Sequence, residues 1–375
     1  MKRVALNLFA SHRIQTGIGT YLTGLVSGLS GIERDLEIVL VLNSEGKEIF
    51  SDHLGGFESF TAPRISDNIK TRVLYEHTFL SSDLKKIGID LLHSPVFVSP
   101  FNYRGKGVLT VHDTTFITHP QYHIPSKRLY FKWGIPRSVK KCDKVVAISE
   151  NTRKDLIGLY PEESSKFVYI PYGIKKEFFS PLPPEREAEL MKFSLPENFI
   201  LYVGVLEPRK NIEGIIKAFN EIRERIPGHK LVLAGRKGWY YDPIFELVRD
   251  LGLQDSVIHI GHVDYLTLPG LFRKASLFTY PSFYEGFGMP VLEAMASGCP
   301  VVTSDISSTK EIGGDGCAFA DPNDVKGIAS AMVSILSDPL RRSSLVEKGL
   351  KRAAEFSWES AAKRTMELYH EVLDA

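Results

Sequence analysis

Two glutamates in the last third of the chain stand eight positions apart in a glycine-rich segment. Glu285 and Glu293 bracket "EGFGMPVLE", which follows the apolar run "ASLFTY". We expect a helix to begin at Pro290, a residue suited to the first helical position, and to end near Gly298. Glu285 then lies just before the helix and Glu293 in its first turns, so both carboxylates can face one ligand.

The segment between the glutamates is suited to an anion. The main-chain amides of Gly286, Phe287 and Gly288 are open to close approach because glycine has no Cβ, and a helix N-terminus attracts negative charge. Carboxylates accept hydrogen bonds from neighbouring hydroxyls. A sugar nucleotide satisfies both features, with its diphosphate on the amides and its sugar and ribose on the carboxylates. The alternative is that Glu293 is an ordinary polar helix residue and Glu285 a solvated turn residue.

Two adjacent cations follow another predicted strand. Arg209 and Lys210, in "YVGVLEPRKNIEG", lie between a strand end and Asn211, a plausible N-cap of the next helix. Ligand crevices in parallel sheets lie beyond the carboxyl ends of the strands. The pair could neutralise the charge that builds up on a departing diphosphate, or it could be a basic pair on the surface.

A histidine ends a buried strand of the first half. His112, in "LTVHDTTF", could bond a sugar hydroxyl or take part in proton movement. The competing interpretation is a buried histidine bonded to a backbone carbonyl. Asp113 either orients this histidine or caps the turn.

A glycine turn also follows the first predicted strand, in "RIQTGIGTYLTGLV". The dinucleotide fingerprint would need a third glycine where Leu22 stands, and it would need an acidic residue after the second strand. We therefore disfavour a nicotinamide cofactor. Gly17 and Gly19 are interpreted as a close backbone approach to phosphate or acceptor.

These turns need a scaffold of parallel strands to position them. Short, nearly continuous apolar runs alternate with helical patterns in both halves, which predicts two doubly wound α/β units with parallel sheets. The expected strands are "VALNLF", "LEIVLVL", "IDLLHS", "GVLTVHD", "DKVVAIS" and "FVYIPYG", then "FILYVGVL", "KLVLAG", "SVIHIGH", "ASLFTY" and "PVVTS". A proline cluster at 178–190 predicts the linker between the units.

Composition restricts the classes of function. The 375 residues are 43% hydrophobic and 24% charged, in the range of soluble two-domain proteins, and the net charge of +1 provides no overall field for nucleic acid. No metal or redox spacing links Cys142, Cys299 and Cys317, so we expect buried residues in a reducing compartment. The start lacks the apolar stretch of a signal peptide and no run is long enough to span a bilayer, which favours a cytoplasmic protein.

Taken together, the motifs resemble retaining glycosyltransferases of family 4, whose GT-B fold consists of two facing Rossmann-like, doubly wound parallel-sheet domains with a cleft between them. The resemblance extends over almost the whole chain. It implies an acceptor-side domain at 1–180 plus 358–375 and a donor-nucleotide domain at 181–357, because the family's last helix returns to the first domain. The motifs that carry it are "GIGTYL", "TVHD", "VVAISENTRKDL", "YIPYGI", "YVGVLEPRKN", "IGHV", "YPSFYEGFGMPVLEAMASGCPVVTSD", "CAFADPND" and "FSWESAAKRTMELYHEVL".

The resemblance also implies roles for the residues. Glu285 is similar to the glutamate that contacts the transferred sugar, and Glu293 to the one that holds the donor ribose. Arg209 and Lys210 are similar to the diphosphate clamp, and His112 to the histidine near the donor sugar. The remaining implied donor contacts are Gly17 and Gly19, the backbone around His262 and Val263, and Gly286, Phe287, Gly288 and Met289.

One position departs from the family pattern. Many members have an arginine directly after the glycine of the "YVG" strand end, whereas this chain has Val205, so the anion clamp would depend on Arg209. The resemblance implies hexose transfer with retention from a nucleoside diphosphate sugar to a hydroxyl of a glycan or lipid-linked acceptor, with no cofactor or metal required. "GVLEPRKN" is most similar to bacterial mannosyltransferases of surface polysaccharide synthesis, which suggests GDP-mannose as donor.

A basic and aromatic segment runs from residue 126 to residue 144, "SKRLYFKWGIPRSVKKCDK". Such a segment suits docking on anionic lipid, and it would then give peripheral contact with the inner face of a membrane. The alternative is an amphipathic helix packed on its own domain with a solvated basic face.

Other functions can use the same donor pocket. A sugar-nucleotide epimerase or hydrolase would act without a glycan acceptor, and product analysis separates these activities. A non-catalytic sugar-nucleotide sensor is disfavoured because His112, Arg209, Lys210, Glu285 and Glu293 are all present.

Overall fold

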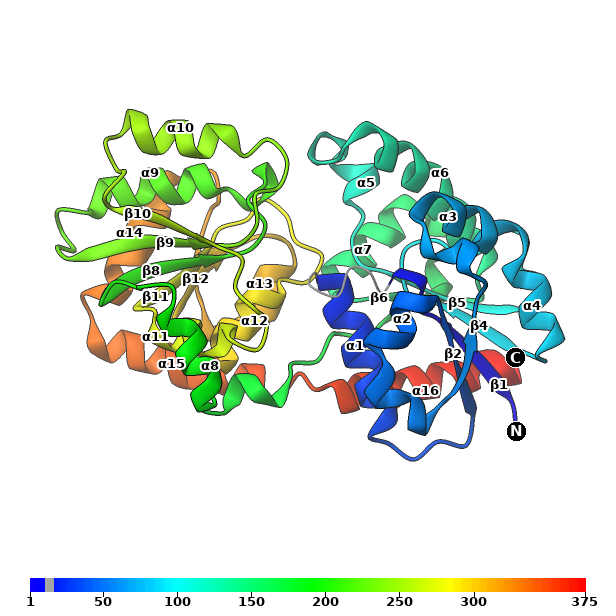
Figure 1. Ribbon diagram of the computed structural model, residues 1–375. Coiled ribbons are helices and arrows are strands. Elements are labelled where there is room, and N and C mark those ends of the chain that lie inside the picture. Colours follow the sequence, from blue (N-terminus) through cyan, green and yellow to red (C-terminus); the bar gives the residue numbers. More distant parts are fainter. Residues whose placement is uncertain (11–16) are drawn as a thin grey trace. The chain divides into compact units, whose positions relative to one another are not determined.

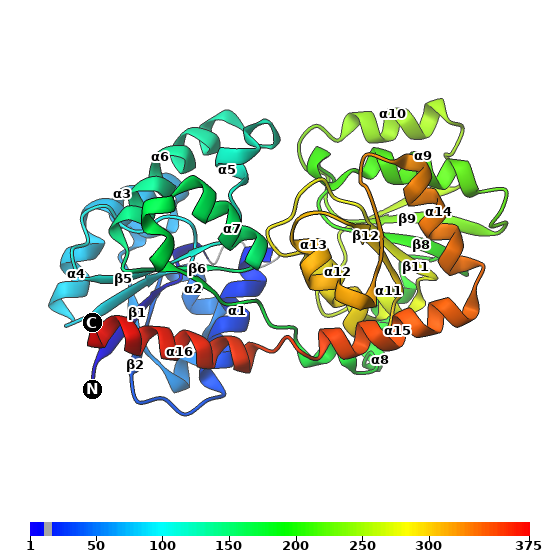
Figure 2. The ribbon, with the colours of Figure 1, turned by 180° about the vertical axis from the view of Figure 1, so that it is seen from behind.

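The protein forms two compact units, each with its own parallel sheet. The computed structural model describes residues 1–10 and 17–375. The first unit comprises Met1–Gly173 and Ser357–Ala375, and the second comprises Ile174–Phe356. Figure 1 shows both units and Figure 2 shows them from behind.

The boundaries between the units differ slightly from the sequence-based placement. The chain divides after Gly173 and after Phe356, whereas the sequence suggested divisions after residues 180 and 357. The proline-rich segment is part of the second unit: Pro184 opens helix α8, and the Leu182 side chain packs against Gly270 of helix α11. The prolines therefore start a helix.

Strands of the first unit form one sheet in the order β3-β2-β1-β4-β5-β6-β7, and all their pairings are parallel. Helices α1 and α16 cover one face, and α3 and α6 cover the other (Figures 1 and 2). The strands are β1 (Arg3–Asn7), β2 (Glu37–Leu42), β3 (Glu58–Thr61), β4 (Leu91–Ser94), β5 (Lys106–Val111), β6 (Lys144–Ala147) and β7 (Phe167–Tyr169). The helices are α1 (Gly17–Ser30), α2 (Ser44–Ile49), α3 (Ile69–Thr78), α4 (Leu80–Lys86), α5 (Thr115–Thr118), α6 (Pro125–Lys141), α7 (Glu150–Leu159) and α16 (Trp358–Asp374).

Strands of the second unit are also parallel, in the order β10-β9-β8-β11-β12-β13. Helices α9, α10 and α14 lie on one face, with α8, α11 and α15 on the other (Figure 1). The strands are β8 (Asn198–Val203), β9 (His229–Ala234), β10 (Val257–Gly261), β11 (Leu277–Tyr280), β12 (Val301–Ser304) and β13 (Ala318–Ala320). The helices are α8 (Pro184–Met191), α9 (Ile212–Ile222), α10 (Asp242–Asp250), α11 (Leu268–Lys274), α12 (Met289–Ala296), α13 (Ser307–Gly313), α14 (Val325–Leu336) and α15 (Pro339–Ala353).

All the expected strands are present, and two further strands occur at sheet edges. Strand β3 is largely exposed and β13 is three residues long, so neither produces the continuous apolar run by which buried strands are recognised. Each sheet reverses its strand order once, between β1 and β4 in the first unit and between β8 and β11 in the second. Such switch points are where doubly wound sheets bind ligands.

The C-terminal helix α16 belongs to the first unit because it packs closely on α1. Gly24 and Gly28 allow this approach: a Cβ on Gly24 would come within 2.0 Å of the Trp358 ring, and one on Gly28 within 2.3 Å of the Trp358 carbonyl. Farther along α16, the Tyr369 hydroxyl lies 2.6 Å from Nδ1 of the buried His93 on strand β4. This contact joins the end of the chain to the centre of the first sheet.

The α1–α16 packing predicts that Gly24→Ala destabilises the protein. The added methyl group would overlap the fully packed Trp358 ring, and overpacking of this kind costs about 1–3 kcal/mol of unfolding free energy. Gly158→Ala in α7 is the matched control, because a Cβ there meets no described atom within 4 Å and alanine favours a helix. Chemical denaturation of both variants checks this, and equal stability of the two would contradict the packing.

Candidate active site

An ion cluster occupies the switch point of the second sheet. Arg209 and Lys210 end a short 3₁₀ turn, Pro208–Lys210, that follows β8, while Glu285 follows β11. Lys210 Nζ lies 2.6 Å from Glu285 Oε1, and Arg209 Nη1 lies 3.1 Å from Glu285 Oε2. Each oxygen of one carboxylate therefore faces its own cation. The structure brings together these three residues, which the sequence singled out from separate motifs.

Further groups fix the positions of the two cations. Arg209 Nη2 donates to Glu207 Oε1 at 2.9 Å, and Nη1 donates to the Tyr284 carbonyl at 2.8 Å. Lys210 Nζ donates to the Tyr280 hydroxyl at 2.5 Å and lies 5.0 Å from the centre of its ring. Glu207 is a site residue that the sequence analysis did not select, although its place two residues before Arg209 was a usable signal.

The electrostatics of the cluster favour the ionised carboxylate. Burial alone would raise the pKa of Glu285, but Arg209 and Lys210 outweigh it and hold the pKa at about 2. The pKa of Lys210 is lowered by burial and by Arg209, against the opposing effect of Glu285 and Glu207. Lys210 is buried and the Arg209 side chain is 16% exposed, and this partial shielding from water strengthens their interaction with any anion that reaches them.

Asn211 supports the cluster in a way that differs from the prediction. It precedes α9, but its side chain makes no capping hydrogen bond to that helix. The Asn211 amide donates instead to the carbonyls of Pro281, at 3.0 Å, and Pro322, at 2.7 Å. Its backbone adopts the left-handed conformation, with φ 55°, which asparagine tolerates better than most residues. Asn211 therefore ties the turn after β8 to the segment after β11.

The glycine-rich segment leads into α12 as expected, with the helix starting one residue earlier, at Met289, and Pro290 in its first turn. Gly288 has φ 97°, a conformation that favours glycine, so the chain can turn directly into the helix. The Glu285 carbonyl accepts from Ser308 Oγ at 2.7 Å, which fixes the backbone beneath the carboxylate. Phe287 is buried, and its ring lies edge-on to Phe356.

Glu293 lies inside α12 and is 4% exposed. Burial raises its pKa to about 7, and a hydrogen bond with Tyr265 and the charge of Lys175 limit the rise. Glu293 is buried and has little positive charge near it to compensate its own charge. It is therefore not an ordinary polar residue of a helix surface. Glu285 is only 6% exposed, so the alternative that it is a solvated turn residue is wrong.

The predicted nucleobase contacts lie on the same unit. Val263 is buried and His262 is exposed just after β10. Burial and the charge of Arg236 lower the pKa of His262. Arg236 follows β9 and is exposed, so it is another cation at the carboxyl ends of these strands. The sequence analysis did not select it. Val205, at the position where the sequence resemblance led us to expect an arginine, is 38% exposed.

His112 belongs to the first unit and is almost fully buried. Its Nε2 lies 2.7 Å from the Pro95 carbonyl, and its Nδ1 is bonded to the Tyr172 hydroxyl. These are the contacts of a histidine bonded to a backbone carbonyl, which was one of the two interpretations. Asp113 accepts from the amide and hydroxyl of Thr115, so it caps the turn; no hydrogen bond to His112 is seen among the described residues.

Gly17 and Gly19 stand in the first turn of α1. A Cβ on Gly17 would meet no atom of the described residues within 4 Å, whereas Gly19 is buried. The start of the glycine turn, residues 13–16, lies outside the described residues.

The raised pKa of Glu293 predicts a pH-dependent stability. A carboxyl whose pKa rises on folding from 4.5 to about 7 stabilises the folded state below pH 4.5, and this contribution is lost as pH rises through 7. The loss is about 3 kcal/mol. Glu293→Gln cannot titrate, so its melting temperature relative to the unchanged protein should rise between pH 5 and pH 8. A difference that stays constant over that range would contradict the burial of this carboxyl.

Comparison with known proteins identifies the family. The model described as "Glycosyltransferase Family 4" matches residues 16–178, and that described as "Glycosyl transferases group 1" matches residues 186–352. O-antigen chain mannosyltransferase B of Escherichia coli is 34% identical over 284 residues, which is 74% of this chain and 74% of that protein. The serotype-specific mannosyltransferase WbdA of Escherichia coli is 32% identical over 63% of this chain but only 30% of its own length.

The fold agrees with these matches. Sucrose-phosphate synthase from Thermosynechococcus elongatus superposes with a TM-score of 0.77 over 100% of both chains, at 21% identity, and the structural neighbours of this chain have the GT-B fold. Both predicted α/β units are thereby confirmed as the two domains of that fold. With the ion cluster at the expected strand ends, the chain belongs to the GT-B glycosyltransferases that combine a family 4 domain with a group 1 domain.

Proposed function

We propose that this glycosyltransferase moves mannose from GDP-mannose to a hydroxyl of a growing surface glycan, with retention of configuration at the anomeric carbon. The observation that carries the proposal is the Glu285, Arg209 and Lys210 cluster at the switch point of the second sheet. Mannose as the sugar is supported by the mannosyltransferases among the relatives, and guanosine as the base follows from the sequence resemblance.

In this proposal the cluster stabilises the leaving group. The bond from the anomeric carbon to the phosphate oxygen breaks, and its electron pair stays on the diphosphate. Arg209, Lys210 and the main-chain amides at the start of α12, from Gly286 to Met289, counter that charge. The acceptor hydroxyl forms the new bond on the same face of the sugar and passes its proton to the departing phosphate oxygen.

The two glutamates bind the uncharged parts of the donor. Glu285 accepts hydrogen bonds from hydroxyls of the transferred sugar, and its low pKa keeps it an acceptor throughout the reaction. Glu293 holds the ribose, and the backbone at His262 and Val263 meets the base. The sequence resemblance also implies donor or acceptor contacts by Gly17, Gly19 and His112 of the first unit, and these roles stay predictions. His112 has bonds on both ring nitrogens, which does not favour a role in moving a proton.

Donor binding and chemistry can be tested with a matched pair of lysine variants. Lys210→Ala should lower turnover by at least about 100-fold, as removal of one stabilising donor does in other enzymes, while Lys217→Ala on the exposed face of α9 should change little.

The identity of the donor can be tested with a thermal-shift panel of GDP-mannose, GDP, UDP-glucose, UDP and NADH. Only the GDP ligands should raise the melting temperature.

The outcomes separate the parts of the proposal. Near-normal turnover of Lys210→Ala would remove the clamp. Stabilisation by UDP ligands alone would keep the fold and the pocket but reject GDP-mannose. Product released without an acceptor would favour the hydrolase or epimerase alternative, and binding without any product would favour the non-catalytic one. Turnover that persists in EDTA is expected, because the clamp assigns the charge stabilisation to Arg209 and Lys210.

Helix α6 is proposed to bring the enzyme to an anionic membrane surface. One face packs on its own unit, where Phe131 and Ile135 are buried and Tyr130 packs against the core. The opposite face is exposed and basic, and it carries Leu129, 73% exposed, and Trp133, 47% exposed, with Arg137 stacked 3.7 Å above the Trp133 ring. No described helix is both long and apolar enough to cross a membrane. Of the three aromatic residues in this segment, Tyr130, Phe131 and Trp133, only Trp133 is exposed.

This surface predicts binding to vesicles of anionic lipid at low salt. Each basic residue near such a surface contributes about 1 kcal/mol. Lys132→Glu with Arg137→Glu should therefore abolish co-sedimentation, whereas Arg341→Glu with Lys351→Glu, on α15, should preserve it. If the unchanged protein does not sediment with the vesicles, the membrane proposal is rejected.

A further inference from the structure

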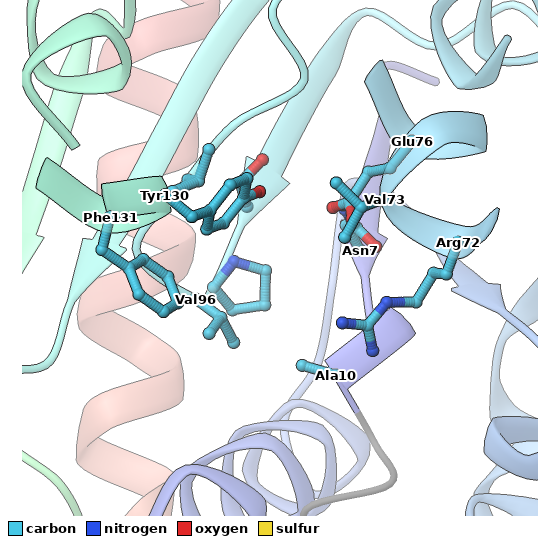
Figure 3. Close-up of a pocket in the computed structure, with 11 residues that line it drawn as sticks. Asn7, Ala10, Arg72, Val73, Glu76, Val96, Tyr130 and Phe131 are labelled. Carbon is cyan, nitrogen blue, oxygen red and sulfur yellow. The ribbon is translucent and has the colours of Figure 1, made fainter. Parts of the chain in front are cut away.

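The first unit has a pocket at its own switch point. Asn7 is the last residue of β1 and Ser94 the last of β4, the two strands between which the sheet order reverses. Helices α3 and α6 supply the opposing walls (Figure 3). Residues lining the pocket include Asn7, Arg72, Glu76, Ser94, Tyr130 and Phe131. Because this is where doubly wound sheets bind ligands, the second ligand of a two-substrate enzyme is expected here.

One wall is polar and held in place. Asn7 Nδ2 donates to Glu76 Oε1 at 2.6 Å, and Arg72 Nη1 donates to the Phe9 carbonyl at 2.8 Å. Ser94 is 1% exposed, and its hydroxyl has no hydrogen-bond partner among the described residues. A buried hydroxyl without a partner is unfavourable, so a ligand that bonds to Ser94 would recover that free energy.

The other wall is aromatic, with Tyr130 and Phe131 facing Glu76 and Arg72 across the pocket in Figure 3. The Phe101 amide donates to His77 Nδ1 at 3.3 Å, which leaves the proton on Nε2, and Nε2 lies 3.0 Å from the Tyr130 hydroxyl. Burial lowers the pKa of His77 to about 4, so this neutral tautomer persists at physiological pH. The Tyr130 hydroxyl therefore accepts a hydrogen bond from His77, so it can donate its own proton to a different acceptor.

These walls match a neutral, hydroxyl-rich ring better than a phosphate. Burial raises the pKa of Glu76, while Arg72 and the hydrogen bond with Asn7 oppose the rise. The charge of Arg72 is therefore already matched by the Glu76 carboxyl group, which leaves little net positive charge for an anion. A pyranose offers hydroxyls that both donate and accept at its edge and apolar C–H groups on its face. Glu76, Ser94 and Arg72 suit the edge, while Tyr130 and Phe131 suit the face.

We propose that this pocket binds one pyranose unit of the acceptor glycan, with Glu76 and Ser94 bonded to its hydroxyls and Tyr130 and Phe131 against its ring. Its assignment to the acceptor rests on the proposed transferase function, whereas sugar binding itself does not. Glu76 and Ser94 thereby become acceptor-binding residues of the first unit, separate from the donor residues of the second.

Ligand-observed NMR on the full chain tests the proposal. The probes are methyl α-glycosides of mannose, glucose, galactose and N-acetylglucosamine, with inorganic phosphate as the contrasting ligand and GDP as the probe of the donor site. At least one glycoside should bind and phosphate should not. Glu76→Gln and Ser94→Ala should each weaken that glycoside by about tenfold, as loss of a buried hydrogen bond does, while GDP binding stays unchanged.

The control is Glu48→Gln, which makes the same change at an exposed position of α2 and should preserve glycoside binding. The proposal is overturned if no glycoside binds, if phosphate binds instead, or if both pocket variants bind the glycoside as the unchanged protein does. Ser94→Ala keeps the test valid if Glu76→Gln unfolds, because it removes a single unpartnered oxygen. Glycoside binding without GDP binding would leave the pocket standing and reject the proposed donor.

Discussion

A buried carboxylate at the end of β11 is the constraint on which the candidate active site of the second unit depends. Glu285 is 6% exposed, and a carboxylate so far from water must be matched by positive charge. Lys210 and Arg209 supply it, but only because the 3₁₀ turn after β8 aims both side chains at the same oxygen pair. That turn requires Asn211 in a left-handed conformation and Glu207 to orient Arg209.

The cluster is poorly explained as a source of stability alone. Burying an ion pair removes two groups from water, and apolar residues of similar volume often stabilise a protein as well or better. Here two cations and two carboxylates share one strand-end site, and the main-chain amides before α12 lie in the same segment as Glu285. Such an arrangement is suited to receive an anion without reorganising, which is what stabilisation of a departing diphosphate requires.

Sequence patterns predicted the scaffold well because buried parallel strands are continuous apolar runs. The candidate site residues were then found directly after the ends of those strands. Edge strands β3 and β13 were missed because one is exposed and the other very short. Glu285, Arg209 and Lys210 were selected from local motifs, but their mutual contacts depend on the order β8-β11, which no local pattern contains. Glu207, the bracing by Asn211 and the pocket around Glu76 and Ser94 likewise depend on residues distant in sequence.

The most direct test of this account is the unfolding free energy of the double variant Lys210→Met with Glu285→Gln, measured alongside its transfer activity. The account predicts a protein about as stable as the unchanged one, because the buried charges are removed as a pair, yet without measurable transfer. A double variant that loses several kcal/mol of stability would show that the cluster is needed for the fold, and one that still transfers sugar would show that it is not needed for the chemistry; either result would contradict the account.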